Sequence, residues 1–169
     1  MTLGQLVEEV EIWNTPIIGT YLIWKFTQGY CKGHPDGDAP VGILIFFATA
    51  ILTNQILIKP ITNKRNDLQS YVRNFEDTKN SDILLSIHER IKNKRKYTLS
   101  AIDIGIAKGL LVWDTESGKL YPCEVTKIPE RGKNLKSKIL SEGRKAEILG
   151  KWFSKHEIST IATYLKVVL

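Results

Sequence analysis

One pair of side chains in this sequence has the spacing of metal ligands, Cys31-x-x-His34, in the loop from Cys31 to Pro40. A structural zinc site needs four such ligands, and they usually come in closely spaced pairs. Cys123 and His156 are the remaining candidates, and each stands alone and far along the chain. We therefore favour a turn with an incidental thiol and imidazole, and expect no bound metal.

Other catalytic arrangements are also missing from the sequence. Asp36 and Asp38 flank Gly37 and could hold a divalent cation, but turn-forming side chains account for them equally well. No Ser/His/Asp grouping or pair of carboxylates can be built from neighbouring positions, and Gly29 to Gly42 lacks the P-loop and dinucleotide-binding spacings. The sequence therefore predicts a protein that is not an enzyme and needs no cofactor.

Positive charge is concentrated in two stretches of the chain. Residues 88–96 hold five Lys or Arg and one Glu, and residues 131–155 hold eight Lys or Arg and two Glu. Because the whole chain has a net charge of only +6, the remainder is net acidic. A phosphate-contacting surface requires such concentration, since affinity comes from counterions released at several phosphates. A solvated face that keeps the protein soluble is the alternative. The candidate nucleic-acid-binding residues are Lys92, Lys94, Arg95, Lys96, Arg131, Lys133, Lys136, Lys138, Arg144 and Lys145.

The first basic stretch lies within Ser81 to Cys123, which predicts two helices followed by a β-hairpin. Ser81 can cap the first helix, and the hairpin has strands at residues 110–113 and 119–121 around a polar turn at 114–118. This order is typical of a winged helix. The apolar residues that define the two helix faces are Ile83, Leu84, Ile87 and Ile91 in the first and Leu99, Ile102 and Ile106 in the second.

The second of these helices lacks the side chains that read DNA bases. A recognition helix needs Arg, Lys, Asn or Gln on its exposed face. The exposed positions expected here are Ser100, Asp103, Ile104 and Ala107, none of which pairs with a base edge. We therefore expect this winged-helix-like unit to dock protein, with DNA contact made by the flanking lysines. A stand-alone winged-helix transcriptional regulator is the alternative.

Helices are also expected before this unit. Asn14-Thr15-Pro16 starts one that ends near Gly29, and the uncharged run from Pro40 to Ile58 predicts a second. That run has about twelve strongly apolar residues, short of the roughly 20 that a membrane-spanning helix needs, so a buried core helix is favoured. A third helix begins at Asn63 or Asn66. Its apolar face is expected to comprise Leu68, Tyr71, Val72 and Phe75.

Two more helices are expected after the hairpin. The long one carries Gly143 and Gly150, which weaken a helix unless close packing against a neighbour requires them. The fold class is thus mainly α with a small β-hairpin: a helical hairpin, a winged-helix-like unit and C-terminal helices. With 169 residues we expect one compact domain, residues 1–169, with possible lobes at 1–62 and 63–169. The two unpaired cysteines indicate a reducing cytoplasm, and the acidic N-terminus is unlike a secretory signal.

Three stretches carry a family resemblance. They are Asn14-Thr15-Pro16 running into Trp24-x-Phe26 and Gly29-Tyr30; Lys59-Pro60 followed by Arg65; and Ala146-x-x-Leu149-Gly150-Lys151-Trp152-Phe153, with Ser159-Thr160 and Leu165-Lys166-Val167 behind it. With them the chain resembles the small middle components of three-component ABC-ATPase systems, the accessory subunits of Lamassu-type bacterial defence against phages and plasmids.

The resemblance implies a non-catalytic adaptor. Such a subunit would sit on an SMC-like ABC ATPase that senses DNA, and would couple it to an effector subunit, often a nuclease. It provides no catalytic residue to carry over. Arg65, Trp152 and Phe153 match the recurrent pattern and are the candidate partner-binding residues, although an aromatic pair at a helix end is more often core packing.

Overall fold

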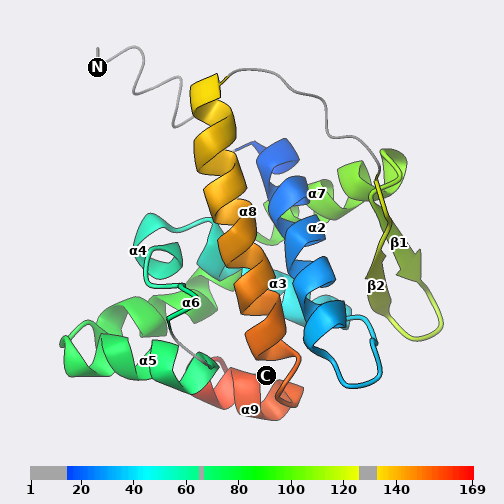
Figure 1. Cartoon of the computed structure of the whole chain (residues 1–169). Helices are drawn as coiled ribbons and strands as arrows, with labels where there is room; N and C mark the ends of the chain where they lie inside the picture. The colour runs from blue at the N-terminus through cyan, green and yellow to red at the C-terminus, as the bar shows by residue number, and fades with distance from the viewer. Residues whose placement is uncertain (1–14, 65–66, 126–132) are drawn as a thin grey trace.

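The computed structural model describes residues 15–64, 67–125 and 133–169. This part of the chain forms eight α-helices and one two-stranded antiparallel hairpin, so the mainly α fold class is confirmed (Figure 1). In chain order the elements are α2 (Pro16–Gly33), α3 (Gly42–Leu52), α4 (Gln55–Ile58), α5 (Leu68–Asp77), α6 (Ser81–Asn93), α7 (Arg95–Ala107), β1 (Leu111–Asp114), β2 (Lys119–Pro122), α8 (Lys133–Phe153) and α9 (Ile158–Tyr164).

The helices α2 and α8 lie side by side at the centre of the molecule (Figure 1). Their backbones touch at two glycines: a Cβ on Gly29 would lie 2.0 Å from the Glu147 carbonyl oxygen, and one on Gly150 would lie 2.1 Å from the Phe26 carbonyl oxygen. No side chain fits at either position. The close packing expected at Gly150 is therefore confirmed. The end of α2 expected near Gly29 is wrong, because that glycine permits the helix contact and α2 continues to Gly33.

The apolar run from Pro40 forms two helices rather than one, the buried α3 and the short α4, in which Leu57 and Ile58 are buried and Ile56 is exposed. All but three residues of α3 are buried, which confirms the core helix. The run breaks at Asn54, whose side-chain oxygen accepts hydrogen bonds from the amides of Ile56 (2.9 Å) and Leu57 (3.1 Å) and so starts α4. Within the described ranges, no helix is both long enough and apolar enough to cross a membrane.

The starts of α5 and α6 differ from expectation. The cap of α5 is Asp67, whose carboxylate accepts a 2.8 Å hydrogen bond from the Ser70 amide, not Asn63 or Asn66. Ser81 is the first residue of α6, and Asn80 before it occupies the N-cap, but its side chain makes no capping hydrogen bond. The expected apolar face of α5 is confirmed in full: Leu68, Tyr71, Val72 and Phe75 are all buried.

Helix α7 buries small residues and exposes large ones. Ala101 and Gly105 face inward, and the Thr20 hydroxyl of α2 donates a 2.6 Å hydrogen bond to the Ala101 carbonyl. This close approach turns the helix so that Leu99 and Ile106 remain 45% and 42% exposed. The expected apolar stripe is therefore wrong at these two positions and right only at Ile102, which is buried.

The β-hairpin is confirmed, with Val112 opposite Tyr121, Trp113 opposite Leu120 and a turn closed by Gly118 at φ 67°. A positive φ suits glycine, which has no Cβ to clash. The hairpin follows α7 directly, so the predicted order of two helices and a hairpin is present (Figure 1).

Candidate functional site

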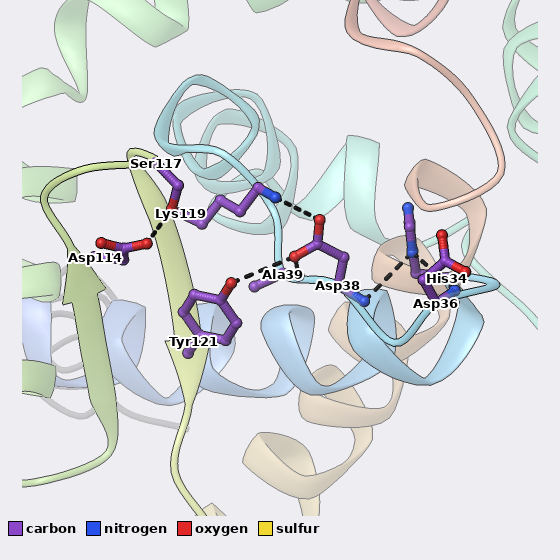
Figure 2. A network of polar contacts seen from close by, with 8 residues as sticks. All are labelled: His34, Asp36, Asp38, Ala39, Asp114, Ser117, Lys119 and Tyr121. Carbon is purple, nitrogen blue, oxygen red and sulfur yellow. Dashed lines mark hydrogen bonds and ion pairs between the residues drawn. The ribbon is translucent and has the colours of Figure 1, made fainter.

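The hairpin is fastened to the loop between α2 and α3 (Figure 2). The Lys119 ammonium of β2 forms an ion pair with Asp38, and the Tyr121 hydroxyl donates a 3.4 Å hydrogen bond to the same carboxylate. The hydrogen bond from Lys119 is the main cause that holds the pKa of Asp38 below its usual value. The Leu120 amide donates to the Pro40 carbonyl (3.0 Å) and the Gly42 amide to the Gly118 carbonyl (2.9 Å). The hairpin is thus held against the rest of the protein by side-chain and backbone contacts and does not project freely into solvent.

The imidazole of His34 organises this loop from within. Its Nδ1 accepts hydrogen bonds from the backbone amides of Asp36 (3.2 Å) and Asp38 (3.3 Å), as Figure 2 shows. Both cysteines, Cys31 and Cys123, are free thiols. Among the residues that the structure describes, no three His, Cys, Asp or Glu side chains gather in a way that could hold a metal ion. Cys31 lies in the last turn of α2, and His34 is the residue that follows the helix.

A cleft of about 610 Å³ opens between this loop, β2 and the turn that joins α8 to α9. Tyr30, His34, Lys119 and His156 are among its lining residues. The Ser154 hydroxyl at its wall donates to the Lys151 carbonyl (2.8 Å) and not to an imidazole. The sequence did not reveal the cleft, because its walls come from three segments that are far apart along the chain.

The first basic stretch lies at the corner between α6 and α7. Lys92, Arg95 and Lys96 are exposed there. Lys94 is half-buried, with its ammonium 4.7 Å from the centre of the Tyr97 ring, and burial followed by the charge of Arg90 lowers its pKa. Three of the four candidates in this stretch are therefore exposed, with the Lys92 ammonium 3.5 Å from the Glu89 carboxylate, and the fourth packs on an aromatic ring.

The second basic stretch is divided by the structure. Lys138 and Arg144 are exposed on α8. The Lys145 ammonium instead turns inward and donates hydrogen bonds to the carbonyls of Lys59 and Ile61, both at 2.8 Å. Burial lowers its pKa. Lys145 thus closes the carbonyl end of α4, and its hydrogen-bonding capacity is taken up by the protein itself.

The other candidates of this stretch lie at or before the start of α8. Lys133 and Lys136 are in its first turns, and Arg131 lies outside the described residues. Farther along the helix, the Glu147 carboxylate neutralises part of the positive charge: it lies 2.9 Å from the Lys32 ammonium, 3.5 Å from that of Lys25 and 3.8 Å from that of Lys151. Counting charges along the sequence could not show the pairs with Lys25 and Lys32, because these two lysines come from α2.

The candidate partner-binding aromatics are core residues in this structure. Trp152 is 3% exposed and Phe153 is fully buried. The Phe153 ring packs edge-on against Phe26 at 5.4 Å, and the Trp152 ring lies 5.7 Å from Tyr71. Core packing is thus what the structure shows for the pair. The third candidate, Arg65, lies outside the described residues.

The comparisons with known proteins find one family. A family model described as ABC-three component (ABC-3C) system Middle Component 3 matches residues 3–169. No curated protein and no solved structure matches the chain.

Proposed function

Because the chain belongs to the Middle Component 3 family of ABC-three component systems, we propose that it docks on an SMC-like ABC ATPase and couples DNA sensing to an effector subunit of nuclease type. The match over residues 3–169 is the observation that carries this proposal, since it covers nearly all of the chain. The setting we propose is a Lamassu-type defence complex in the bacterial cytoplasm, in which this subunit acts without catalysing a reaction.

The geometry supports an adaptor that touches both protein and DNA. Exposed lysines and arginines at the α6–α7 corner and on α8 offer positive charge to phosphates. Base-specific reading gains no support, because the exposed side chains of α7 include Leu99, Asp103 and Ile106. A transcriptional regulator that reads bases through α7 is therefore the weaker alternative.

Co-expression tests the proposed partner. The tagged protein is produced together with the ABC ATPase and the third component encoded beside it, and the complex is purified at moderate salt. We expect the ATPase to co-purify in a fixed ratio. Recovery of the protein as a monomer that ignores both components would refute the proposed function.

Charge reversal tests the proposed DNA contact. We expect Lys138→Glu with Arg144→Glu to weaken duplex binding equally for all sequences. The slope of log K against log salt should fall by about 0.9 for each phosphate that the variant no longer neutralises. Arg73→Glu with Lys79→Glu is the matched control, because both residues are exposed on or beside α5 and the charge change is the same. An unchanged slope in the first variant would remove α8 from the DNA-binding surface.

A further inference from the structure

The outer face of α7 carries two large apolar side chains that the described part of the fold covers only in part. Leu99 and Ile106 are 45% and 42% exposed. Together with the exposed Asp103 they occupy positions i, i+4 and i+7, so all three lie on one stripe of the helix. We call this set the α7 face. It exists because α7 buries its small residues against α2.

Positive charge borders the α7 face at its N-terminal end. Arg95 and Lys96 precede Leu99 by four and three residues, which places them next to it on the helix surface. Lys108 is also exposed, but it lies two residues after Ile106 and therefore on the opposite side of the helix. The face thus has an apolar centre with one carboxylate and a cationic N-terminal end.

Duplex DNA matches only part of this pattern. Phosphates would pair with Arg95 and Lys96, but they offer no apolar counterpart to Leu99 or Ile106 and would repel Asp103. A protein helix with apolar residues on one side and acidic residues beside them matches all of it. Such a helix would cover the apolar centre and set carboxylates against the cationic end formed by Arg95 and Lys96.

We propose that the α7 face docks an amphipathic helix with acidic borders from another component of the same complex. The two basic stretches then meet different partners: the α6–α7 corner helps to hold a protein, and α8 meets DNA. This inference rests on the proposed function, because it names the surface through which the subunit joins its complex.

Substitution of Leu99 and Ile106 by lysine tests this inference, because it should have opposite effects on the binding of a protein partner and of DNA. Leu99→Lys with Ile106→Lys adds positive charge while removing apolar contact. We expect the affinity for the ABC ATPase or the third component, whichever the wild type binds through this face, to fall at least tenfold. Duplex binding should stay equal or become tighter. Leu85→Lys on α6 is the matched control, since Leu85 is 56% exposed, and it should change neither affinity.

The outcomes distinguish the inference from the function on which it rests. If the wild type binds both components and the double lysine variant binds them within twofold of it, the α7 face is not the docking surface, although the proposed function stands. Loss of duplex binding in that variant would assign the face to DNA and would also overturn the inference. A wild type that binds neither component would overturn both proposals. Circular dichroism and the melting temperature establish that the variants fold, and Leu99→Ser with Ile106→Ser replaces the lysine pair if they do not.

Discussion

Neighbouring residues on α8 show how much the role of one side chain depends on its direction. Arg144 is exposed, whereas the ammonium of Lys145 binds backbone carbonyls beyond the end of α4. Glu142, two positions before Arg144, is 5% exposed, and one of its carboxylate oxygens has no hydrogen-bond partner within the described residues. In the sequence all three residues look like parts of one charged helix surface.

Replacement of Lys145 should therefore affect stability more than DNA binding. We expect Lys145→Met to lower the free energy of unfolding by about 1–3 kcal/mol, because the carbonyls of Lys59 and Ile61 lose a charged donor. Chemical denaturation with an unchanged m-value measures this loss. Arg144→Met is the control, with a stability change within about 0.5 kcal/mol and a weaker affinity for duplex DNA. A stable Lys145→Met protein with impaired DNA binding would contradict the assignment.

Glu142 should make stability depend on pH. Its carboxylate accepts a 3.3 Å hydrogen bond from Gln55, but burial is the largest influence and raises its pKa in the folded protein. Between the ordinary pKa of a glutamate and this raised value, the folded chain binds more protons than the unfolded chain. Stability from this group therefore falls as pH rises through that window.

We accordingly expect Glu142→Gln to raise the melting temperature by a few degrees at pH 7 to 8. The gain should shrink as the pH falls below the ordinary glutamate value, because both side chains are then uncharged. Thermal melts across this pH range measure it, with the exposed Glu89→Gln as control. A difference that is independent of pH would show that the Glu142 carboxylate is not destabilised by burial.

At the scale of elements, the glycines of α2 and α8 set how closely the two helices approach. A Cβ on Gly150 would meet backbone, with the Tyr30 amide nitrogen at 2.7 Å in addition to the Phe26 carbonyl. A Cβ on Gly143, about two turns earlier on α8, would lie closest to the side chain of Tyr21, at 2.7 Å. Backbone cannot move aside without separating the helices, but a side chain at the surface can.

The same substitution should therefore have different effects at these two glycines. We expect Gly150→Ala to cost stability at or above the upper end of the usual range for overpacking, which is about 1–3 kcal/mol. Gly143→Ala should be close to neutral, because the better helix propensity of alanine, worth up to about 1 kcal/mol, offsets the displacement of Tyr21. Denaturant unfolding of both variants measures the contrast. A near-neutral effect of Gly150→Ala, equal to that of Gly143→Ala, would mean that the two helices can move apart at Gly150 at little cost.

The contacts that hold the hairpin to the loop between α2 and α3 are a second feature at the scale of elements. The ion pair between Asp38 and Lys119 is partly exposed, and such pairs contribute about 0–1 kcal/mol. We expect Asp38→Asn to leave the melting temperature nearly unchanged, while hydrogen exchange at the Gly42 and Leu120 amides becomes faster, because the hairpin opens locally more often. Asp36→Asn in the same loop is the control. Unchanged exchange at both amides would show that backbone contacts alone hold the hairpin.

At the scale of the whole molecule, many contacts join the two lobes expected at 1–62 and 63–169. Helix α2, from the first, contacts α7, β2 and α8 from the second. The Trp24 indole donates a 2.9 Å hydrogen bond to the Cys123 carbonyl, and Arg90 donates one of 3.0 Å to the Ala50 carbonyl. Neither lobe could open without exposing the apolar surface that the other covers.

We therefore expect the chain to unfold in a single cooperative transition. Its calorimetric and van't Hoff enthalpies should agree, and the amides of α2 and α8 should exchange most slowly. Differential scanning calorimetry and native-state hydrogen exchange measure these properties. Two resolved transitions would instead support two lobes that fold separately.

Sequence reasoning succeeded where a feature depends on residues near one another in the chain. The apolar face of α5, the hairpin and its turn, and the start of α2 at Pro16 all follow from local spacing, turn residues and a proline at the first helical position. It failed for the exposed face of α7 and for the end of α2 near Gly29. Close contact between α2 and each of its neighbours decides both, and no local pattern encodes that contact.

Patterns along the chain were enough to predict the helical fold class, the hairpin and the family, because hydrophobic periodicity, turn residues and recurrent motifs are local features. Which charges and apolar groups reach the surface followed from tertiary packing alone. Lys145 points into the protein because the carbonyls it binds lie 86 and 84 residues earlier in the chain. Leu99 and Ile106 point outward because Ala101 and Gly105 allow α7 to approach α2 and β1. Whether a side chain is exposed depends on the segments that pack beside it. In this protein those segments come from distant parts of the sequence.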